Sequence, residues 1–199
     1  GLILADKTGN LYWIIFPLLV RAAGVFSSII STYSVRSAGQ GENAMKPIRR
    51  GFILAAVISV VSFFLFAWLY TKDLRFFWAT SVGIVLAVVI QYITEYYTST
   101  EYGPVKEIAK ATKTGPATTI LAGWASGYES TVMSVIVIAI SIIASAVIWQ
   151  GGGGPGSNID VIIYIFYGVA LCGIGQLTLT GNNVAMDSFG PIVDNANGI

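Results

Sequence analysis

Positions 52–70 read FILAAVISVVSFFLFAWLY, without a single charged side chain. A bilayer core about 30 Å thick needs about twenty apolar residues in a helix that rises 1.5 Å per residue. Further runs of this kind occupy 11–35, 76–97, 116–149 and 161–186. So little polar sequence separates the five runs that they cannot all be buried inside a water-soluble domain. The sequence therefore predicts an all-α fold, a polytopic transmembrane helix bundle, with 1–199 as a single transmembrane region.

The composition supports this class of protein. Hydrophobic residues make up 55% of the chain and charged residues 11%, and the mean hydropathy is +0.73. A soluble domain has about 25% charged residues, so this chain lacks the polar surface that water requires and is expected to contact membrane lipid. The net charge of +1 gives no reason to expect a nucleic-acid partner. Histidine is absent, which excludes imidazole catalysis, and the single Cys172 excludes an internal disulfide.

Charge in the connecting segments predicts the orientation. Basic residues gather after the first and third runs, at Arg36, Lys46, Arg49, Arg50, Lys106, Lys110 and Lys113. The opposite connections hold only Lys72 and Arg75, and 150–160 has no basic residue. The positive-inside rule places the richer connections in the cytoplasm. The fifth run then crosses inward, so 187–199 are expected on the cytoplasmic side of a membrane, the inner membrane of a cell.

Two carboxylates follow the fifth run. Asp187 and Asp194 are seven positions apart, and at about 100° per helical residue they lie within about 20° of one face. Aligned carboxylates where a helix leaves the bilayer favour a hard cation such as Mg²⁺. Gly190-Pro191 lies between them, and proline removes a helical donor, so a kink is expected there and the alignment is approximate.

Two glutamates are candidates for an ion pathway or for coupling. Glu95 closes the third run and is either an interfacial residue beside tyrosines or an inward-facing carboxylate. Glu129 lies in the fourth run, where a charge at the bilayer centre costs about 2.5–3.5 kcal/mol and would require protein, water or a cation. The cost falls if the first third of that run projects into the cytoplasm.

Other polar residues in the runs also need partners. We expect Arg21 to pair with a carboxylate of a neighbouring helix rather than to snorkel. Positions 103–116 predict a short amphipathic cytoplasmic helix whose lysines either reach phosphate or form a solvated face. Small and amide residues in the fifth run predict a central position in the bundle. They are Gly173, Gly175, Gln176, Thr178, Thr180, Gly181, Asn182 and Asn183.

Three motifs resemble one family in order and spacing. TEYYTS at 94–99, TGPAT at 114–118 and DSFGPIVDN at 187–195 are similar to segments of membrane-bound, ion-pumping inorganic pyrophosphatases. The resemblance covers about 93–199, and the hydropathy of the first two runs fits it. It implies a homodimer with about sixteen helices per subunit, in which the five spans here match about the seventh to the eleventh. It also implies hydrolysis of Mg-pyrophosphate at the cytoplasmic side and outward transport of H⁺ or Na⁺.

The resemblance assigns roles to individual residues. Asp187 matches a catalytic and metal-binding aspartate on the eleventh helix, beside the magnesium ions. Asp194 matches a second acidic position of the metal site, and Asn195 the loop of that site. Glu95 matches a glutamate whose acidity the family needs. The sequence departs from the commoner pattern at Phe189, Val193 and Asn197, which removes no carboxylate and leaves the subfamily open.

Two further expectations complete the interpretation. The chain begins at Gly1 without methionine and ends within a motif, so we expect an internal piece of a longer polypeptide. The family's other aspartate and lysine motifs would lie outside it, so the chain alone is expected not to hydrolyse pyrophosphate. The main alternative is a secondary transporter that uses Glu95, Glu129 and Asp187 as coupling carboxylates without hydrolysis, although the inverted repeat of such transporters is not seen. A purely structural scaffold ranks last, because it has no reason to place acids together.

Overall fold

The computed structural model describes residues 1–36, 45–152 and 159–198. These residues form helices and turns, and no strand occurs among them. The elements in chain order are α1 (Leu2–Thr8), α2 (Tyr12–Thr32), α3 (Met45–Phe66), a π-helical segment η1 (Ala67–Thr71), α4 (Leu74–Thr98), α5 (Gly103–Ala111), α6 (Pro116–Trp149), α7 (Val161–Gln176), a 3₁₀ turn η2 (Leu177–Leu179) and α8 (Thr180–Asn197).

Local chemistry explains several helix ends. The Asp73 side chain caps α4, because its Oδ1 accepts the Arg75 amide hydrogen at 2.9 Å. Pro104 and Pro116 stand in the first turns of α5 and α6, where a missing amide hydrogen costs nothing. Lys72 adopts φ 55°, a left-handed conformation that ends the π-helical segment and reverses the chain into α4.

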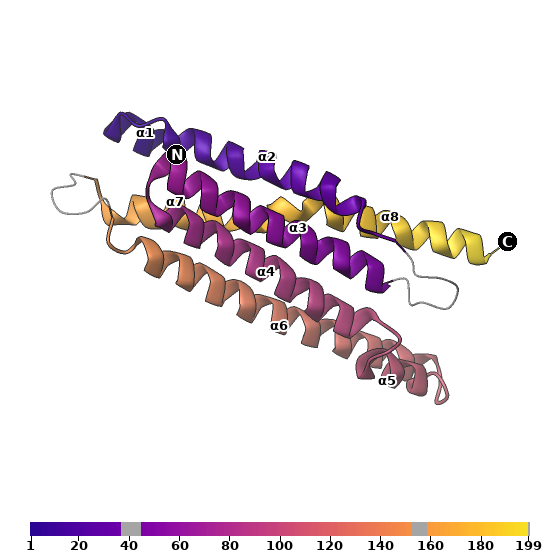
Figure 1. Cartoon of the computed structure of the whole chain (residues 1–199). Coiled ribbons are helices and arrows are strands. Elements are labelled where there is room, and N and C mark those ends of the chain that lie inside the picture. Colours follow the sequence, from indigo (N-terminus) through magenta and orange to yellow (C-terminus); the bar gives the residue numbers. More distant parts are fainter. Residues whose placement is uncertain (37–44, 153–158, 199) are drawn as a thin grey trace.

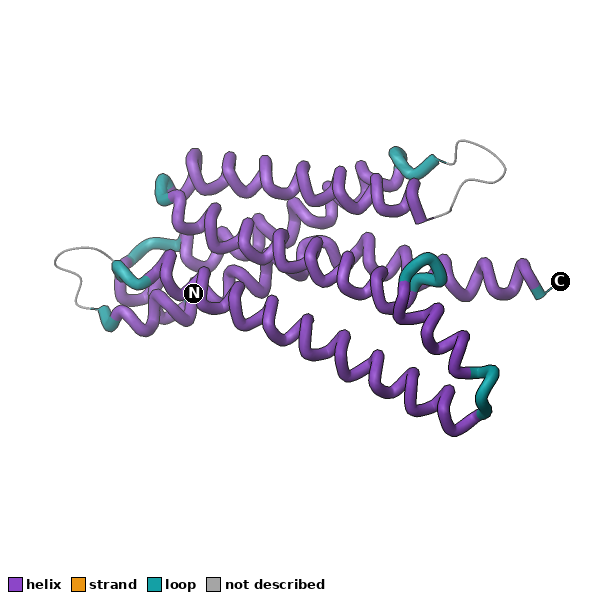
Figure 2. The backbone as a smooth tube through the Cα atoms, turned by 90° about the horizontal axis from the view of Figure 1, so that it is seen from below, coloured by secondary structure: helices purple, strands orange, loops and turns teal. Residues whose placement is uncertain are grey.

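The long helices run side by side in one elongated bundle (Figure 1). Helix α4 is central, with contacts to α3, α6 and α7, while α2 packs on α3 and α6 forms an edge (Figures 1 and 2). One end of the bundle gathers the end of α2, the short α5 and the C-terminal part of α8. The other end gathers α1 and the starts of α4 and α7. The start of α3 and the short α5, which carry basic residues, therefore lie at the same end of the bundle.

Five helical segments are long and apolar enough to cross a membrane. They are Tyr12–Thr32, Pro47–Thr71, Leu74–Ala111, Pro116–Trp149 and Val161–Ala185. The fourth agrees residue for residue with the predicted run. The second helix begins earlier than predicted, so Arg49 and Arg50 lie within its first turns rather than in a loop. Hydropathy detects the apolar part of a helix but not the helical turns with polar side chains that extend it. The connections at 37–44 and 153–158 lie outside the described residues.

An aromatic cluster fills the end of the bundle that carries α1. Trp13 and Tyr167 lie with ring centroids 5.0 Å apart, and the Tyr167 hydroxyl donates to the Trp13 carbonyl at 2.9 Å. Phe76 and Trp149 pack edge to face at 5.2 Å, and the Arg75 guanidinium lies 4.7 Å from the Trp149 ring centroid. All four rings are buried, so this end of the bundle has a rigid apolar core.

The fifth span is not one regular helix. It runs as α7 to Gln176, tightens into the 3₁₀ turn η2, and continues as α8 to Asn197. The predicted interruption at Gly190-Pro191 does not divide the span, because α8 includes Pro191. The irregular turn instead lies at Leu177–Leu179, between Gly175 and Gly181.

Candidate functional site

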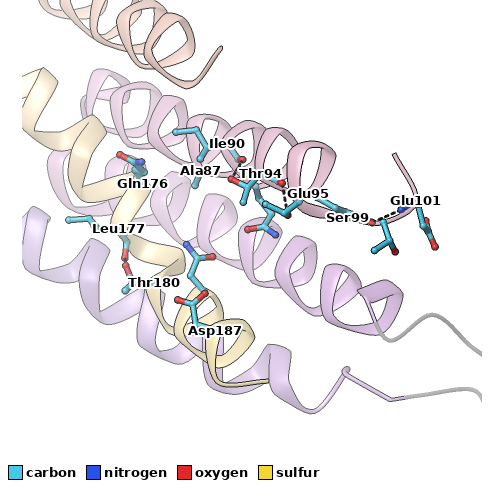
Figure 3. Close-up of a pocket in the computed structure, with 14 residues that line it drawn as sticks. Ala87, Ile90, Thr94, Glu95, Ser99, Glu101, Gln176, Leu177, Thr180 and Asp187 are labelled. Atoms are coloured by element: carbon cyan, nitrogen blue, oxygen red, sulfur yellow. Dashed lines mark hydrogen bonds between the residues drawn. The ribbon is translucent and has the colours of Figure 1, made fainter. Parts of the chain in front are cut away.

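A polar cavity of about 680 Å³ lies between α4 and the fifth span. Figure 3 shows Glu95 approaching it from α4 and Asp187 from α8. Both residues were predicted from sequence to be functional, although they are far apart in the chain. The structure therefore brings two of the candidate carboxylates to the same cavity. The described residues that line it are Ala87, Ile90, Gln91, Thr94, Glu95, Thr98, Ser99, Thr100, Glu101, Gln176, Leu177, Thr180, Asn183 and Asp187.

One face of α4 forms the first wall. Gln91, Thr94, Glu95 and Thr98 recur at three- and four-residue spacings, which place them on the same side of a helix. The threonine hydroxyls donate to carbonyls one turn earlier, as Thr94 does to Ile90 at 2.9 Å and Thr98 to Thr94 at 2.7 Å. Their hydroxyl oxygens keep lone pairs for an occupant of the cavity.

The fifth span forms the facing wall. Gln176, Thr180, Asn183 and Asp187 are separated by four, three and four residues, so one helical stripe faces the cavity. Most of these residues belong to the polar set that predicted a central position for this span, and here they line the cavity. The turn η2 contributes Leu177 to the same wall.

Glu95 is held by an ion pair. Its Oε1 lies 3.4 Å from Nη1 of Arg49, on the first turns of α3, and its side chain is 12% exposed while that of Arg49 is 39% exposed. Such a partly exposed pair contributes about 0.2–1 kcal/mol. Glu95 thus lines the cavity and also forms an ion pair with Arg49. Arg49 had been interpreted from sequence mainly as a topology anchor.

Asp187 lies in α8 and is exposed to the cavity. Among the described residues, none forms an ion pair with it. Asp194 follows in the same continuous helix, so the backbone supports the predicted seven-residue alignment, but its side chain lies outside the described part. Asn195 is exposed in the last turn of α8. Of the two predicted metal ligands, Asp187 is therefore the one whose side chain is described, and it lines the cavity.

Glu129 lies apart from these residues. It is exposed on α6 and lines a separate cavity of about 290 Å³, beside Glu107 of α5 and Tyr96 of α4. The amphipathic helix predicted at 103–116 is present as α5, and it flanks the part of α6 that carries Glu129. The structure does not bring Glu129 into the cavity of Glu95 and Asp187.

Among the residues that the structure describes, no carboxylate pairs with Arg21 as predicted. The partner described for its guanidinium is the carbonyl of Leu177, in the turn η2. A guanidinium needs hydrogen-bond acceptors, and a carbonyl is one that a 3₁₀ turn in a neighbouring helix exposes.

The donor atoms of the cavity suit a hard cation. Carboxylate, amide and hydroxyl oxygens line it, and none of the described lining residues is a lysine or arginine. Mg²⁺ prefers such oxygen ligands and binds through one or two carboxylates together with substrate phosphates. Within the described ranges, no group of three or more His, Cys, Asp or Glu residues could hold a metal ion by itself. The cavity fits one side of a magnesium–phosphate site.

Three polar lining residues escaped the sequence analysis, namely Gln91, Thr100 and Glu101. Glu101 lies in the connection between α4 and α5, and Gln91 lies one turn before Glu95. The repeat of polar residues at 91, 94, 95 and 98 was a signal that could have found Gln91. Nothing local marks Glu101, whose place depends on how the chain turns after α4.

Comparison with known proteins matches the whole chain to one family. The family described as "Inorganic H+ pyrophosphatase" matches residues 1–199. The chain is 45% identical to a K⁺-insensitive pyrophosphate-energized proton pump of Chloroflexus aurantiacus, over 98% of this chain and 26% of that protein. It is 38% identical to a pump of the same description in Methanosarcina mazei, over 94% and 26%. A putative K⁺-stimulated pyrophosphate-energized sodium pump of Clostridium tetani is 36% identical, over 98% and 27%. The chain thus spans about a quarter of the length of these relatives.

Proposed function

Because the chain belongs to the family of inorganic H⁺ pyrophosphatases, which are multi-pass membrane proteins, we propose that the complete protein couples Mg²⁺-dependent hydrolysis of pyrophosphate to outward transport of H⁺ or Na⁺. The observation that carries the proposal is the position of Asp187 and Glu95 on two walls of one cavity lined by oxygen donors. Relatives include both proton and sodium pumps, so the proposal covers either ion.

Asp187 is the proposed catalytic and metal-binding residue. Its carboxylate lies at a cavity where the described lining residues include no lysine or arginine, so a divalent cation is the natural partner for its charge. Mg²⁺, when bound, would neutralise pyrophosphate and polarise its phosphorus–oxygen bonds. Asn183 and Thr180, one and two turns before Asp187, offer an amide and a hydroxyl that can orient phosphate oxygens or water. Asp194 and Asn195 are proposed to complete this end of the site.

Glu95 is proposed to act beside the hydrolytic residues rather than as a metal ligand. Arg49 lies 3.4 Å from its carboxylate and fixes the side chain at the edge of the cavity. A carboxylate held between a cation and a polar cavity is suited to admit an ion or to sense charge in the cavity. Glu129, beside Glu107, is proposed as a separate coupling carboxylate.

The site requires more than the residues of this chain. The carboxylates at the cavity are too few to enclose several magnesium ions and a pyrophosphate, so we infer that the 199-residue chain does not hydrolyse pyrophosphate alone. In the complete protein the cavity would open to the cytoplasm, with the α5 end of the bundle inside. Only 11% of the most apolar stretch of the edge helix α6 is buried. Its exposed surface suits contact with lipid, with further helices or with the partner of a homodimer.

The proposal is tested with the complete protein in sealed membrane vesicles. Phosphate release from pyrophosphate and ion uptake are measured together, with Mg²⁺ and with Na⁺ or K⁺ varied. The pump predicts that hydrolysis depends on Mg²⁺ and accompanies uptake of H⁺ or Na⁺. Ion uptake driven by a gradient, without phosphate release, would favour a secondary transporter and contradict the proposal.

A further inference from the structure

Arg21 lies near the middle of α2, where a charge is costly. Helix α2 spans Tyr12–Thr32, and Leu18 and Val25, about one turn on either side of Arg21, are exposed apolar residues. The middle of such a span is about 15 Å from either end, farther than an arginine side chain extends. Snorkelling therefore does not explain the residue. Its guanidinium instead donates to the carbonyl of Leu177 on the fifth span.

The acceptor is an unusual carbonyl. Leu177 begins the turn η2, and its oxygen also accepts the Thr180 amide hydrogen of the 3₁₀ turn and the Thr180 hydroxyl at 2.6 Å. Three donors thus converge on one carbonyl at the point where the fifth span changes from α to 3₁₀ geometry. A cation is the strongest of these donors, because charge-assisted hydrogen bonds are about twice as strong as neutral ones.

The contact belongs to a longer seam between α2 and the fifth span. Arg21, Gly24, Ser28 and Ser31 follow at spacings of three, four and three, so they share one face of α2. A Cβ at Gly24 would lie 2.6 Å from the Thr178 carbonyl oxygen, so only glycine permits this approach. The other contacts of the seam are Ser28 with Gly181 in a cavity of about 180 Å³, and the Ser31 hydroxyl, which accepts from Nδ2 of Asn182 at 2.9 Å.

The seam lies next to the candidate site. Leu177 and Thr180 line the large cavity, and Thr180, Asn183 and Asp187 follow each other along one stripe of α8. The turn η2 sets the rotation at which α8 begins, because a 3₁₀ turn has 3.0 residues where an α turn has 3.6. A change in that turn therefore rotates Asp187 around the axis of α8.

From this geometry we propose that Arg21 is a positioning residue, which stabilises the 3₁₀ turn through the Leu177 carbonyl and so sets the direction in which α8 presents Asp187. The positioning itself needs only the contacts described here. Its effect on Mg²⁺ rests on the function proposed above.

The first test measures position directly. Spin labels are placed at Phe26 on α2 and Ile192 on α8, both exposed, in the complete protein with Cys172 and any other cysteine replaced by alanine. Arg21→Ala should broaden or shift the distance distribution, while Arg21→Lys, which keeps one charged donor, should restore most of it. A control pair at Phe26 and Val57, on α2 and α3, should not change. An unchanged Phe26–Ile192 distribution in Arg21→Ala would overturn the proposal.

A second variant disturbs the seam while keeping Arg21, so that the test does not depend on whether Arg21→Ala folds correctly. Gly24→Ala pushes against Thr178 from the same face and leaves Arg21 in place. It should disturb the same distance if the seam sets the direction of α8. Leu18→Ala, an exposed neighbour on α2, is the matched control and should leave the distance unchanged.

The third measurement links position to the site. Arg21→Ala should raise the Mg²⁺ concentration for half-maximal hydrolysis about tenfold, as expected for losing one hydrogen bond to a charged group, with Arg21→Lys in between. The same change in Leu18→Ala would mark it as a general packing effect and contradict the proposal. If the parent protein hydrolyses no pyrophosphate, the proposed function fails, and the spin-label distances still decide the role of Arg21.

Discussion

Pro191 lies one helical turn after Asp187 within α8 and offers no amide hydrogen to the Asp187 carbonyl. The residue that carries the candidate metal-binding carboxylate therefore also has a main-chain oxygen without its usual helical donor. A proline inside a helix costs about 3 kcal/mol, so its presence at this position needs a reason. An additional oxygen beside a magnesium–phosphate site would be one.

Pro191→Ala should supply the missing hydrogen bond. We expect a higher unfolding temperature for the complete protein and weaker activation by Mg²⁺, because the Asp187 carbonyl is then occupied within the helix. Thermal unfolding in detergent and Mg²⁺ titration of phosphate release measure both effects. Ile192→Ala, at the exposed neighbouring position, is the control. A lower unfolding temperature in Pro191→Ala would show that the proline is needed for the helix itself.

Close packing of α4 on α7 depends on Gly83. A Cβ there would lie 2.0 Å from the Cys172 carbonyl oxygen, so Gly83→Ala should force the helices apart and cost about 1–3 kcal/mol of stability. Gly173→Ala is the matched control, since nothing lies within 4 Å of its Cβ position. Alanine there should stabilise the helix by about 0.5–1 kcal/mol. Thermal unfolding followed by circular dichroism compares the two, and equal effects would refute this packing.

The ion pair of Arg49 with Glu95 is tested by a double-mutant cycle. Arg49→Met, Glu95→Gln and the double variant should give a coupling energy of about 0.2–1 kcal/mol in unfolding measurements. Glu95→Gln should also impair turnover or pumping, whereas Arg50→Met, at the exposed neighbour, should not. A coupling energy of zero would show that the two side chains do not stabilise each other. A fully active Glu95→Gln pump would show that Glu95 has a purely interfacial role.

Membrane orientation is tested by labelling single cysteines in intact cells. With Cys172 replaced by alanine, a cysteine at Lys113 should be protected from an impermeant maleimide, and one at Gln150 should react. Both positions are exposed and lie at opposite ends of the long helix α6. Because they flank one span, the reverse result would invert the orientation and place Asp187 outside.

The span pattern could be predicted from sequence because apolar length is a local property. The fourth run, 116–149, became α6 without change, and the basic residues before the second run belong to α3 because arginine and lysine continue a helix well. The turn η2 could not be predicted in this way. It is contacted from α2 by Arg21 and lies against Gly24, and these long-range contacts leave no local pattern in the sequence.

Part of the candidate site could also be predicted from local sequence. Asp187 and Glu95 were chosen as carboxylates at the ends of apolar runs, and both line the cavity. Glu129 was chosen as a carboxylate inside an apolar run, and it lies at another cavity, beside α5. The ion pair of Arg49 with Glu95 joins residues 46 positions apart, so only the packing of α3 on α4 creates it. Tertiary contacts, rather than composition, decide which acids share a site.

The most decisive experiment measures phosphate release from pyrophosphate by the complete protein carrying Asp187→Asn, in the presence of Mg²⁺. Asparagine keeps the size of the side chain and removes its charge, so hydrolysis should fall by at least about a hundredfold if this carboxylate binds the metal. Ser188→Ala, which removes a hydroxyl that donates to the Val184 carbonyl of its own helix, should retain the parent rate. Near-parental hydrolysis by Asp187→Asn would show that the cavity between α4 and α8 is not where magnesium and pyrophosphate bind.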